Sequence, residues 1–367
     1  MYVPILKNRT IEMKVLSHLA TMGVFDDSNN VFPLVELIQE KARTNIKSTV
    51  MEDLINLLKV APNMSLMIDF FKSTKLNRTT DAIRNYVTLS TRHPDFCINE
   101  MLKFKSYSDR VTPVISYLTD NVSFDRITHE TIEYRKNFPR IAFRIKTQDF
   151  ESVFSHIESL INKNDILLLD IESSSHTNPV FKKIYKRISD SRKQHEFISI
   201  IINANRPETL TNKSMGDNEP IAQIDNSLKE TYGLPMMHKF NGFGDYACIV
   251  ASLPSTGGAI SPAGIFYSDD NNYFVSFKGR KPVLSEFPDY IAPNIINSEY
   301  WEEFDNSHHQ NCPGCQEIVA IVNKEKAGKK SILQVLCKYK IVQKNLFKWT
   351  ELNSVRFYVI RKISTCQ

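Results

Sequence analysis

Short apolar runs recur along the first two thirds of the chain. The clearest is Ile166-Leu167-Leu168-Leu169, which lies between Asp165 and Asp170 and shows no alternation of apolar and polar positions. A continuous aliphatic run of this length is typical of a strand buried on both faces, as in a parallel sheet. Similar runs begin near residues 3, 32, 65, 112, 141, 166, 197 and 240. The pattern therefore predicts eight buried strands.

Segments with helical periodicity follow several of these runs. One of them has apolar residues at spacings of three and four, with acids in its first turn: Phe150, Val153, Phe154, Ile157, Leu160 and Ile161 after Asp149 and Glu151. Acids are favourable at the positive end of a helix, so this segment is expected to be helical. Further apolar faces follow the first and second runs. Strand followed by helix, repeated, is the pattern of parallel βα units.

The spacing of the runs, about 25 to 47 residues, is the length of a strand, a helix and two loops. Eight such units close a (β/α)8 barrel of the TIM type, which needs about 250 residues. An open, doubly wound parallel sheet is the alternative, because the pattern alone does not establish closure. We expect the polar segment 208–227 to be a long loop before the eighth unit.

The alternation of apolar runs with helical segments ends after residue 252. A turn-rich connection with two prolines and two glycines is followed by Ala263 to Tyr267 and Tyr273 to Phe277, which predict a β-hairpin. Farther on, Ile332 to Leu336 fits a helix and Ser354 to Ile360 alternates like a strand. The expected organisation is a barrel over residues 1–252 and an α+β region over residues 253–367.

Composition narrows the class of protein. The net charge of +5, from 46 basic and 41 acidic residues, is slight for 367 residues, so nucleic acid is a possible partner that the charge does not indicate. No stretch approaches the roughly 18 apolar residues that span a bilayer, and the N-terminus has no signal-peptide pattern. We therefore expect a cytoplasmic protein without a membrane partner.

Charged residues end most of the predicted strands. A barrel gathers its site at the carboxyl ends of its strands, so these residues are the candidate mouth site: Lys7, Glu36, Asp69, Arg144, Asp170 and Asp245. Four acids and two bases there could hold a metal, bind phosphate or perform acid–base chemistry. They could equally form ion pairs that only satisfy one another.

Arg206 follows the seventh run, in a region where barrels often bind phosphate. It is the candidate anion ligand, although an ordinary loop arginine is the simpler interpretation.

The string His308-His309-Gln310-Asn311-Cys312-Pro313-Gly314-Cys315 has the spacing of a metal site. Two thiolates in a C-x-x-C can reach one tetrahedral zinc ion, and either histidine could be a third ligand. The candidate zinc ligands are Cys312, Cys315, His308 and His309. The chain has no second C-x-x-C to complete the site, so a turn with inert thiols is the alternative.

In sequence, the chain resembles the phage T4-type beta protein family of bacteria and phages. The resemblance lies in the order of short pieces: Tyr2 to Lys7, Phe32 to Glu36, Ala142 to Ile145, Leu167 to Asp170, Gly244 to Tyr246, and Phe277 to Arg280. It implies a prokaryotic or phage protein with a barrel-like fold and brings no established catalytic activity with it.

Two functions follow as hypotheses. The first is a component of a phage-defence or phage–host conflict system that binds a protein partner, which a neighbouring gene could encode. The second is a barrel enzyme that acts on a phosphate-bearing or nucleotide-like ligand at the charged mouth.

Overall fold

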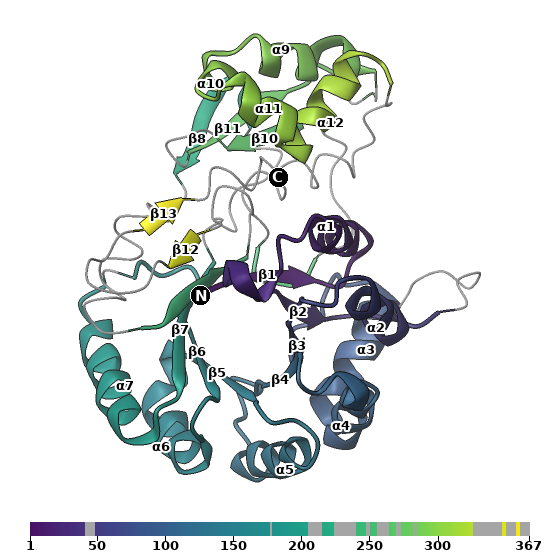
Figure 1. The fold of residues 1–367 in the computed structure, drawn as a ribbon. Helices are drawn as coiled ribbons and strands as arrows, with labels where there is room; N and C mark the ends of the chain where they lie inside the picture. Colours follow the sequence, from purple (N-terminus) through teal and green to yellow (C-terminus); the bar gives the residue numbers. More distant parts are fainter. Residues whose placement is uncertain are drawn as a thin grey trace.

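The eight predicted strands form a closed parallel barrel (Figure 1). The computed structural model describes residues 1–40, 48–176, 178–204, 215–223, 240–246, 250–254, 264–268, 273–281, 283, 285–325, 347–349 and 357–359. The barrel strands are β1 (Tyr2–Lys7), β2 (Leu34–Leu37), β3 (Leu66–Phe70), β4 (Val111–Ile115), β5 (Ala142–Lys146), β6 (Ile166–Asp170), β7 (Ile198–Asn203) and β9 (Gly242–Asp245). Because β1 pairs with both β2 and β9, the (β/α)8 barrel is confirmed and the open sheet is excluded.

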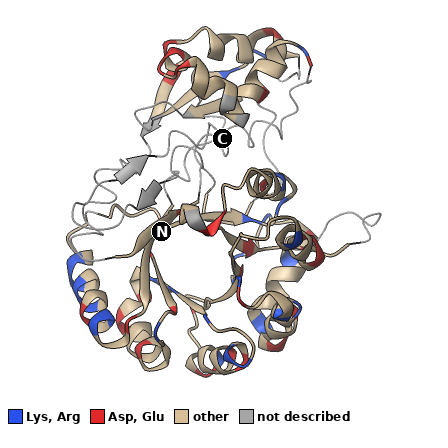
Figure 2. Cartoon of the chain, viewed as in Figure 1, with Lys and Arg blue, Asp and Glu red and all other residues tan. Residues whose placement is uncertain are grey.

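Helices surround the barrel, as the periodicity predicts. They are α1 (Thr10–Thr21), α2 (Val50–Val60), α3 (Asp81–Arg92), α4 (Pro94–Leu102), α5 (Phe124–Arg135), α6 (Phe150–Leu160) and α7 (Phe181–His195), with 3-10 turns η1 (Asp27–Asn29), η2 (Lys105–Tyr107) and η3 (Thr147–Asp149). Thr49 and Glu52 form a capping box that starts α2. Basic and acidic residues are interspersed along these helices in the view of Figure 2.

The interior of the barrel follows the alternation of each strand. One set of side chains packs inside the barrel: Val3, Ile5, Leu34, Met67, Val114, Ala142, Ile166, Leu168, Ile200 and Ile202. The intervening residues pack outward among the helices. Gly244 is required where β9 closes on β1, because a Cβ there would lie 2.6 Å from the Val3 carbonyl oxygen.

A second sheet accompanies the barrel. Its order is β10-β11-β8, with β8 (Glu219–Gln223), β10 (Gly264–Ser268) and β11 (Tyr273–Lys278) all antiparallel. The expectation of a loop over 208–227 is wrong at β8, because Glu219-Pro220-Ile221-Ala222-Gln223 holds a proline and a single large aliphatic residue and so gives no strand signal. A strand from between β7 and β9 thus pairs with β11, which follows the barrel in sequence.

Short helices cover this sheet. They are the π-helical turn η4 (Phe287–Ile291), α9 (Ala292–Ile296), α10 (Glu299–Glu302), α11 (Asn306–Asn311) and α12 (Pro313–Val322). The strands β12 (Phe347–Trp349) and β13 (Phe357–Val359) pair with each other. The helix expected over 332–336 lies outside the described residues, and the boundary expected near residue 252 stays a prediction. None of the described helices has the length and apolar character that a membrane crossing requires.

Candidate functional site

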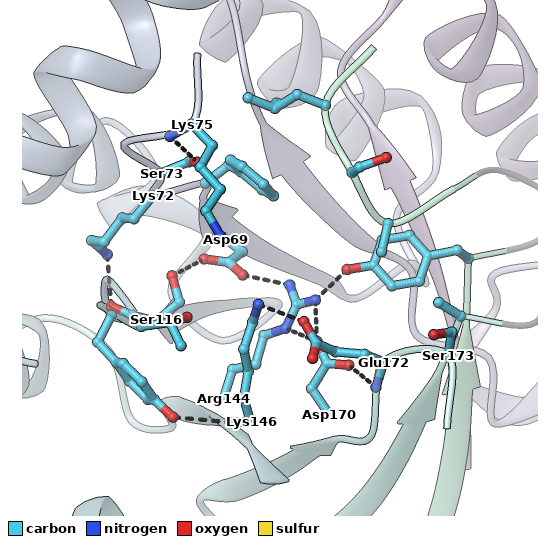
Figure 3. Close-up of a pocket in the computed structure, with 18 residues that line it drawn as sticks. Asp69, Lys72, Ser73, Lys75, Ser116, Arg144, Lys146, Asp170, Glu172 and Ser173 are labelled. Atoms are coloured by element: carbon cyan, nitrogen blue, oxygen red, sulfur yellow. Dashed lines mark hydrogen bonds and ion pairs between the residues drawn. The ribbon is translucent and has the colours of Figure 1, made fainter. Parts of the chain in front are cut away.

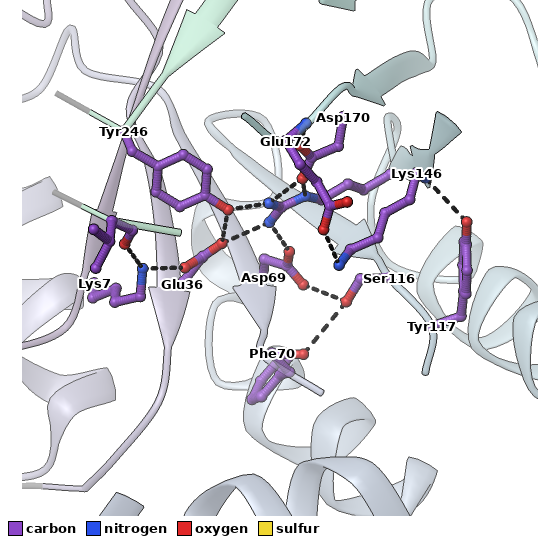
Figure 4. A network of polar contacts seen from close by, with 12 residues as sticks. Lys7, Glu36, Asp69, Phe70, Ser116, Tyr117, Lys146, Asp170, Glu172 and Tyr246 are labelled. Atoms are coloured by element: carbon purple, nitrogen blue, oxygen red, sulfur yellow. Dashed lines mark hydrogen bonds and ion pairs between the residues drawn. The ribbon is translucent and has the colours of Figure 1, made fainter. Parts of the chain in front are cut away.

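Five of the six expected mouth residues meet at the carboxyl end of the barrel (Figure 4). Each lies two residues beyond an interior apolar residue of its strand, so the alternation directs it inward. The register aligns Lys7 with Glu36 and Glu36 with Asp69 across β1, β2 and β3. Arg144 and Asp170 come from the far side of the ring, on β5 and β6. All five residues are buried.

Arg144 is the centre of this mouth network, the set formed by these five residues and Tyr246. Its Nη1 donates to Glu36 Oε1 at 2.7 Å and to Asp69 Oδ2 at 2.9 Å. Its Nε and Nη2 both donate to Asp170 Oδ2, at 2.9 and 2.5 Å. One guanidinium therefore joins carboxylates from three strands, and these charge-assisted bonds fix the positions of all three.

Two further side chains complete the network around Glu36. Lys7 Nζ lies 3.2 Å from Glu36 Oε2 and donates to the Val250 carbonyl oxygen at 2.9 Å. Tyr246 donates to Glu36 Oε1 at 2.8 Å and accepts a hydrogen bond from Arg144 Nη2. With two cations and three carboxylates, the network carries one excess negative charge if all five groups are ionised.

Burial and charge pairing shift these groups in different directions. Burial alone would raise the pKa of Glu36, but Lys7 and Arg144 outweigh it and lower that pKa. Burial raises the pKa of Asp69 despite the opposing charges of Arg144 and Lys72. Burial disfavours charged Arg144, yet its anionic neighbours hold its pKa well above the usual value. Asp69 therefore holds a proton more readily than an ordinary aspartate.

A cavity of about 490 Å³ opens above this network (Figure 3). Its floor includes Asp69, Arg144, Asp170 and Tyr246. Ser116 donates to Asp69 Oδ1 at 2.6 Å, and the Glu172 backbone N–H donates to Asp170 Oδ1 at 2.9 Å. The carboxylates of the floor are thus held in place from both sides before any ligand arrives.

Three lysines line the same cavity: Lys75 and Lys146 lie at its solvent side, whereas the Lys72 side chain is only 2% exposed. Lys72 Nζ donates to the Ser116 carbonyl oxygen at 2.9 Å and lies 3.7 Å from Glu130 Oε2. Lys146 Nζ lies 2.7 Å from Glu172 Oε1, and the side chains of Lys146 and Glu172 are 34% and 44% exposed. Lys75 is exposed. The cavity therefore has a basic rim above a floor of acceptors.

The structure separates Asp245 from the network. Tyr2, whose ring stacks on Phe243, donates to Asp245 Oδ1 at 2.8 Å on the outer face of β9. The next residue, Tyr246, points inward instead. Sequence reasoning missed Tyr246 and the rim lysines, although strict alternation from Gly244 would have placed Tyr246 inside and Asp245 outside. The anion ligand expected at Arg206 lies outside the described residues.

The expected zinc ligands divide into two groups. The candidate ligand atoms of His308, Cys312 and Cys315 all lie within 4.8 Å of one another. His309 instead stacks on the Trp301 ring, with centroids 3.9 Å apart, and its Nε2 lies 3.0 Å from the Trp301 carbonyl oxygen. This cluster belongs to the second sheet and its helices.

Comparison with known proteins identifies the family but not the chemistry. No curated protein matches the chain. A solved family 18 chitinase from Crocus vernus is similar over 66% of this chain and 91% of that one, at 10% identity and a TM-score of 0.34, a level that carries no functional implication. The Beta protein family matches residues 2–311, which include every barrel strand and the second sheet. The chain is therefore a member of the Beta protein family.

Proposed function

We propose that this protein binds a small phosphate-bearing, nucleotide-like ligand at the carboxyl mouth of the barrel. The observation that supports the proposal is the two-part lining of the 490 Å³ cavity, with Lys72, Lys75 and Lys146 above the acceptors held by Arg144. The volume lies within the usual range for small-molecule sites, about 300–1,000 Å³.

The lysine rim suits the phosphate of such a ligand. An ammonium group is a mobile point charge with three donors, a common partner of phosphate oxygens. Lys146 forms a partly exposed ion pair with Glu172, which exchanges easily with solvent and with an incoming anion. Lys72 is held by a hydrogen bond to the Ser116 carbonyl oxygen and by an ion pair with Glu130, so it supplies a positioned charge.

The floor suits the neutral, hydrogen-bonding end of the ligand. Asp69 and Asp170 each accept bonds from the protein and keep further lone pairs for donors of a sugar or base. Tyr246 adds a hydroxyl and an aromatic face to the cavity. If the protein is an enzyme, Asp69 is the group suited to transfer a proton, because burial raises its pKa.

A thermal-shift screen tests this proposal. The probes are inorganic phosphate, pyrophosphate and the four nucleoside monophosphates, each compared with sulfate at equal ionic strength. We expect at least one phosphate compound to raise the melting temperature of the wild-type protein, since a ligand that binds only the folded state stabilises it. Equal shifts for sulfate and for every phosphate compound would contradict a built site.

Lys146→Gln should abolish that shift, and Lys163→Gln is the matched control. Lys163 forms a similar ion pair, 2.8 Å from Glu196, before β6 at the opposite end of the barrel. A shift that survives Lys146→Gln but disappears with Lys163→Gln would place the ligand elsewhere.

We also propose, as a second candidate, a partner-binding component of a phage-defence or phage–host conflict system. This candidate rests on the sequence resemblance to a family of bacteria and phages, and the partner could be encoded by a neighbouring gene. Separate Glu36→Gln and Asp170→Asn variants distinguish the two candidates. Folded variants that keep full biological activity would favour partner binding, and loss of activity with an unchanged copurifying partner would favour chemistry at the mouth. The cytoplasmic location stays a prediction from the sequence.

A further inference from the structure

The cluster formed by His308, Cys312 and Cys315 lies in the helices that cover the second sheet, away from the barrel mouth. His308 belongs to α11, Cys312 joins α11 to α12, and Cys315 lies in the first turn of α12. The close approach of α11 and α12 thus brings an H-x-x-x-C-x-x-C sequence into one place. Both cysteines have 0% exposure.

We propose that His308, Cys312 and Cys315 supply three ligands of one zinc ion. In a tetrahedral site with Zn–S of about 2.3 Å and Zn–N of about 2.0–2.1 Å, ligand atoms lie about 3.6–3.8 Å apart. The ligand atoms here lie within 4.8 Å of one another, so small side-chain rotations bring them to that spacing.

His308 supports this assignment independently of the cysteines. Its Nε2 is buried and has no hydrogen-bond partner among the described residues. An unsatisfied buried polar atom of this kind destabilises the folded protein, and a metal–nitrogen bond would satisfy it. The ring is held in place by stacking on Phe304, with centroids 4.4 Å apart. His308 is thus oriented as a ligand would be.

The surroundings also favour two thiolates. Cys312 is the N-cap of α12 and Cys315 follows Pro313 and Gly314, so both sulfurs lie at the positive end of a ten-residue helix. The Tyr267 side chain, on β10, lies beside Cys315 and can donate to its sulfur. In metal sites, a neighbouring donor of this kind commonly holds a ligand in position.

Metal binding fits these cysteines better than thiol–disulfide exchange. A redox C-x-x-C needs at least one sulfur that solvent and a partner thiol can reach. Both sulfurs here are fully buried beside an imidazole, and the two cysteines do not form a disulfide with each other. A zinc ion in this position would join α11 and α12 to each other next to β10.

Metal analysis of the full chain tests the proposal. The protein is purified without a metal-affinity column, incubated with equimolar zinc and desalted, and zinc is measured by mass spectrometry. We expect a ratio near one zinc per chain for the wild type, and a ratio near zero for His308→Gln, Cys312→Ser and Cys315→Ser. A wild-type ratio near zero, or a disulfide between Cys312 and Cys315, would overturn the proposal.

His309→Gln is the matched control, because His309 also stacks on an aromatic ring but is not part of the cluster of close ligand atoms. It should keep its zinc, and zinc loss equal to that of His308→Gln would contradict the ligand set. Cobalt substitution of the wild type gives a readout that does not require any variant to fold. Thiolate-to-cobalt charge-transfer bands together with strong tetrahedral visible bands are expected, and a weak octahedral spectrum would overturn the assignment.

Discussion

The inside of the barrel has two regions that differ in chemistry while sharing the same strands. The deeper region is apolar, with aliphatic residues such as Leu168 and Ile202 in contact across the ring. The mouth, two residues farther along several strands, is filled by charged groups centred on Arg144. Both regions are almost completely buried.

The two regions therefore tolerate different substitutions. Apolar contacts are non-directional, so the deeper region depends on volume and shape. The mouth depends on pairing, because a buried charge without its partner is far costlier than a lost methyl group. Under the proposed function, the buried charges of the mouth serve a ligand.

The largest expected effect follows from removing the central cation. Arg144→Met leaves Glu36, Asp69 and Asp170 with Lys7 as their remaining cation within the network. Breaking a buried pair in this way costs about 3–5 kcal/mol, which urea unfolding at neutral pH would measure.

Adding Asp170→Asn to Arg144→Met should recover part of that loss, because it removes one of the uncompensated charges. A loss below about 1 kcal/mol for Arg144→Met, typical of an exposed ion pair, would show that the mouth is solvated and would remove the contrast between the two regions.

A steric change in the deeper region should cost less. Gly244→Ala places a Cβ 2.6 Å from the Val3 carbonyl oxygen, which belongs to the backbone and cannot rotate away. Overpacking of this kind costs about 1–3 kcal/mol, again measured by urea unfolding. Ile202→Val, which removes a methyl group near the same glycine, should not rescue it. If Ile202→Val restored the stability of Gly244→Ala, the clash would lie with the Ile202 side chain and not with the Val3 backbone.

The pH dependence of stability distinguishes two of the three carboxylates next to Arg144, Glu36 and Asp69. The pKa of Glu36 is lowered on folding, so its stabilisation is present above its unfolded value of about 4.5 and is lost as pH falls below it. The pKa of Asp69 is raised, so its contribution is full below its unfolded value of about 3.8 and is lost as pH rises.

Glu36→Gln should therefore make the unfolding free energy rise less with pH between about 3 and 6, and Asp69→Asn should make it rise more steeply. Unfolding measured across this range gives the two slopes. Parallel curves for both variants and the wild type would contradict the opposite shifts.

The smallest effect on stability is expected at the rim. Lys146→Gln removes a partly exposed pair with Glu172 and should change the unfolding free energy by less than about 1 kcal/mol. Chemical denaturation of the two proteins side by side provides the measurement. A much larger loss would mean that Lys146 belongs to the structural network and not to the ligand site.

The fold could be predicted from the sequence because strands buried on both faces leave continuous aliphatic runs. All eight barrel strands lie in predicted runs, although the run at β9, Gly242–Asp245, is looser and contains no aliphatic residue, and α6 corresponds to its apolar period. Strand β8 could not be found this way, since a strand of a small second sheet is stabilised by pairing with β11 and not by its own apolar content.

The mouth could be predicted only in part. Charged residues directly after apolar runs indicated Lys7, Glu36, Asp69, Arg144 and Asp170, but the choice between Asp245 and Tyr246 depends on which face of β9 each occupies. Strict alternation would place Asp245 on the same face as Phe243, but β9 has no run of aliphatic residues to show which face is interior. Lys72 follows β3 by two residues, and its place in the cavity depends on a loop path that no local pattern records.

Calorimetric titration of nucleoside monophosphates against their parent nucleosides tests the central claim most directly. We predict that a monophosphate binds the wild-type protein with one site per chain. Its nucleoside should bind at least about tenfold more weakly, because it lacks the phosphate that forms charge-assisted bonds to the rim. Lys75→Gln combined with Lys146→Gln should bring the two affinities together, and Lys163→Gln should leave them apart. Equal binding of nucleotide and nucleoside to the wild type, or no binding of either, would contradict the account.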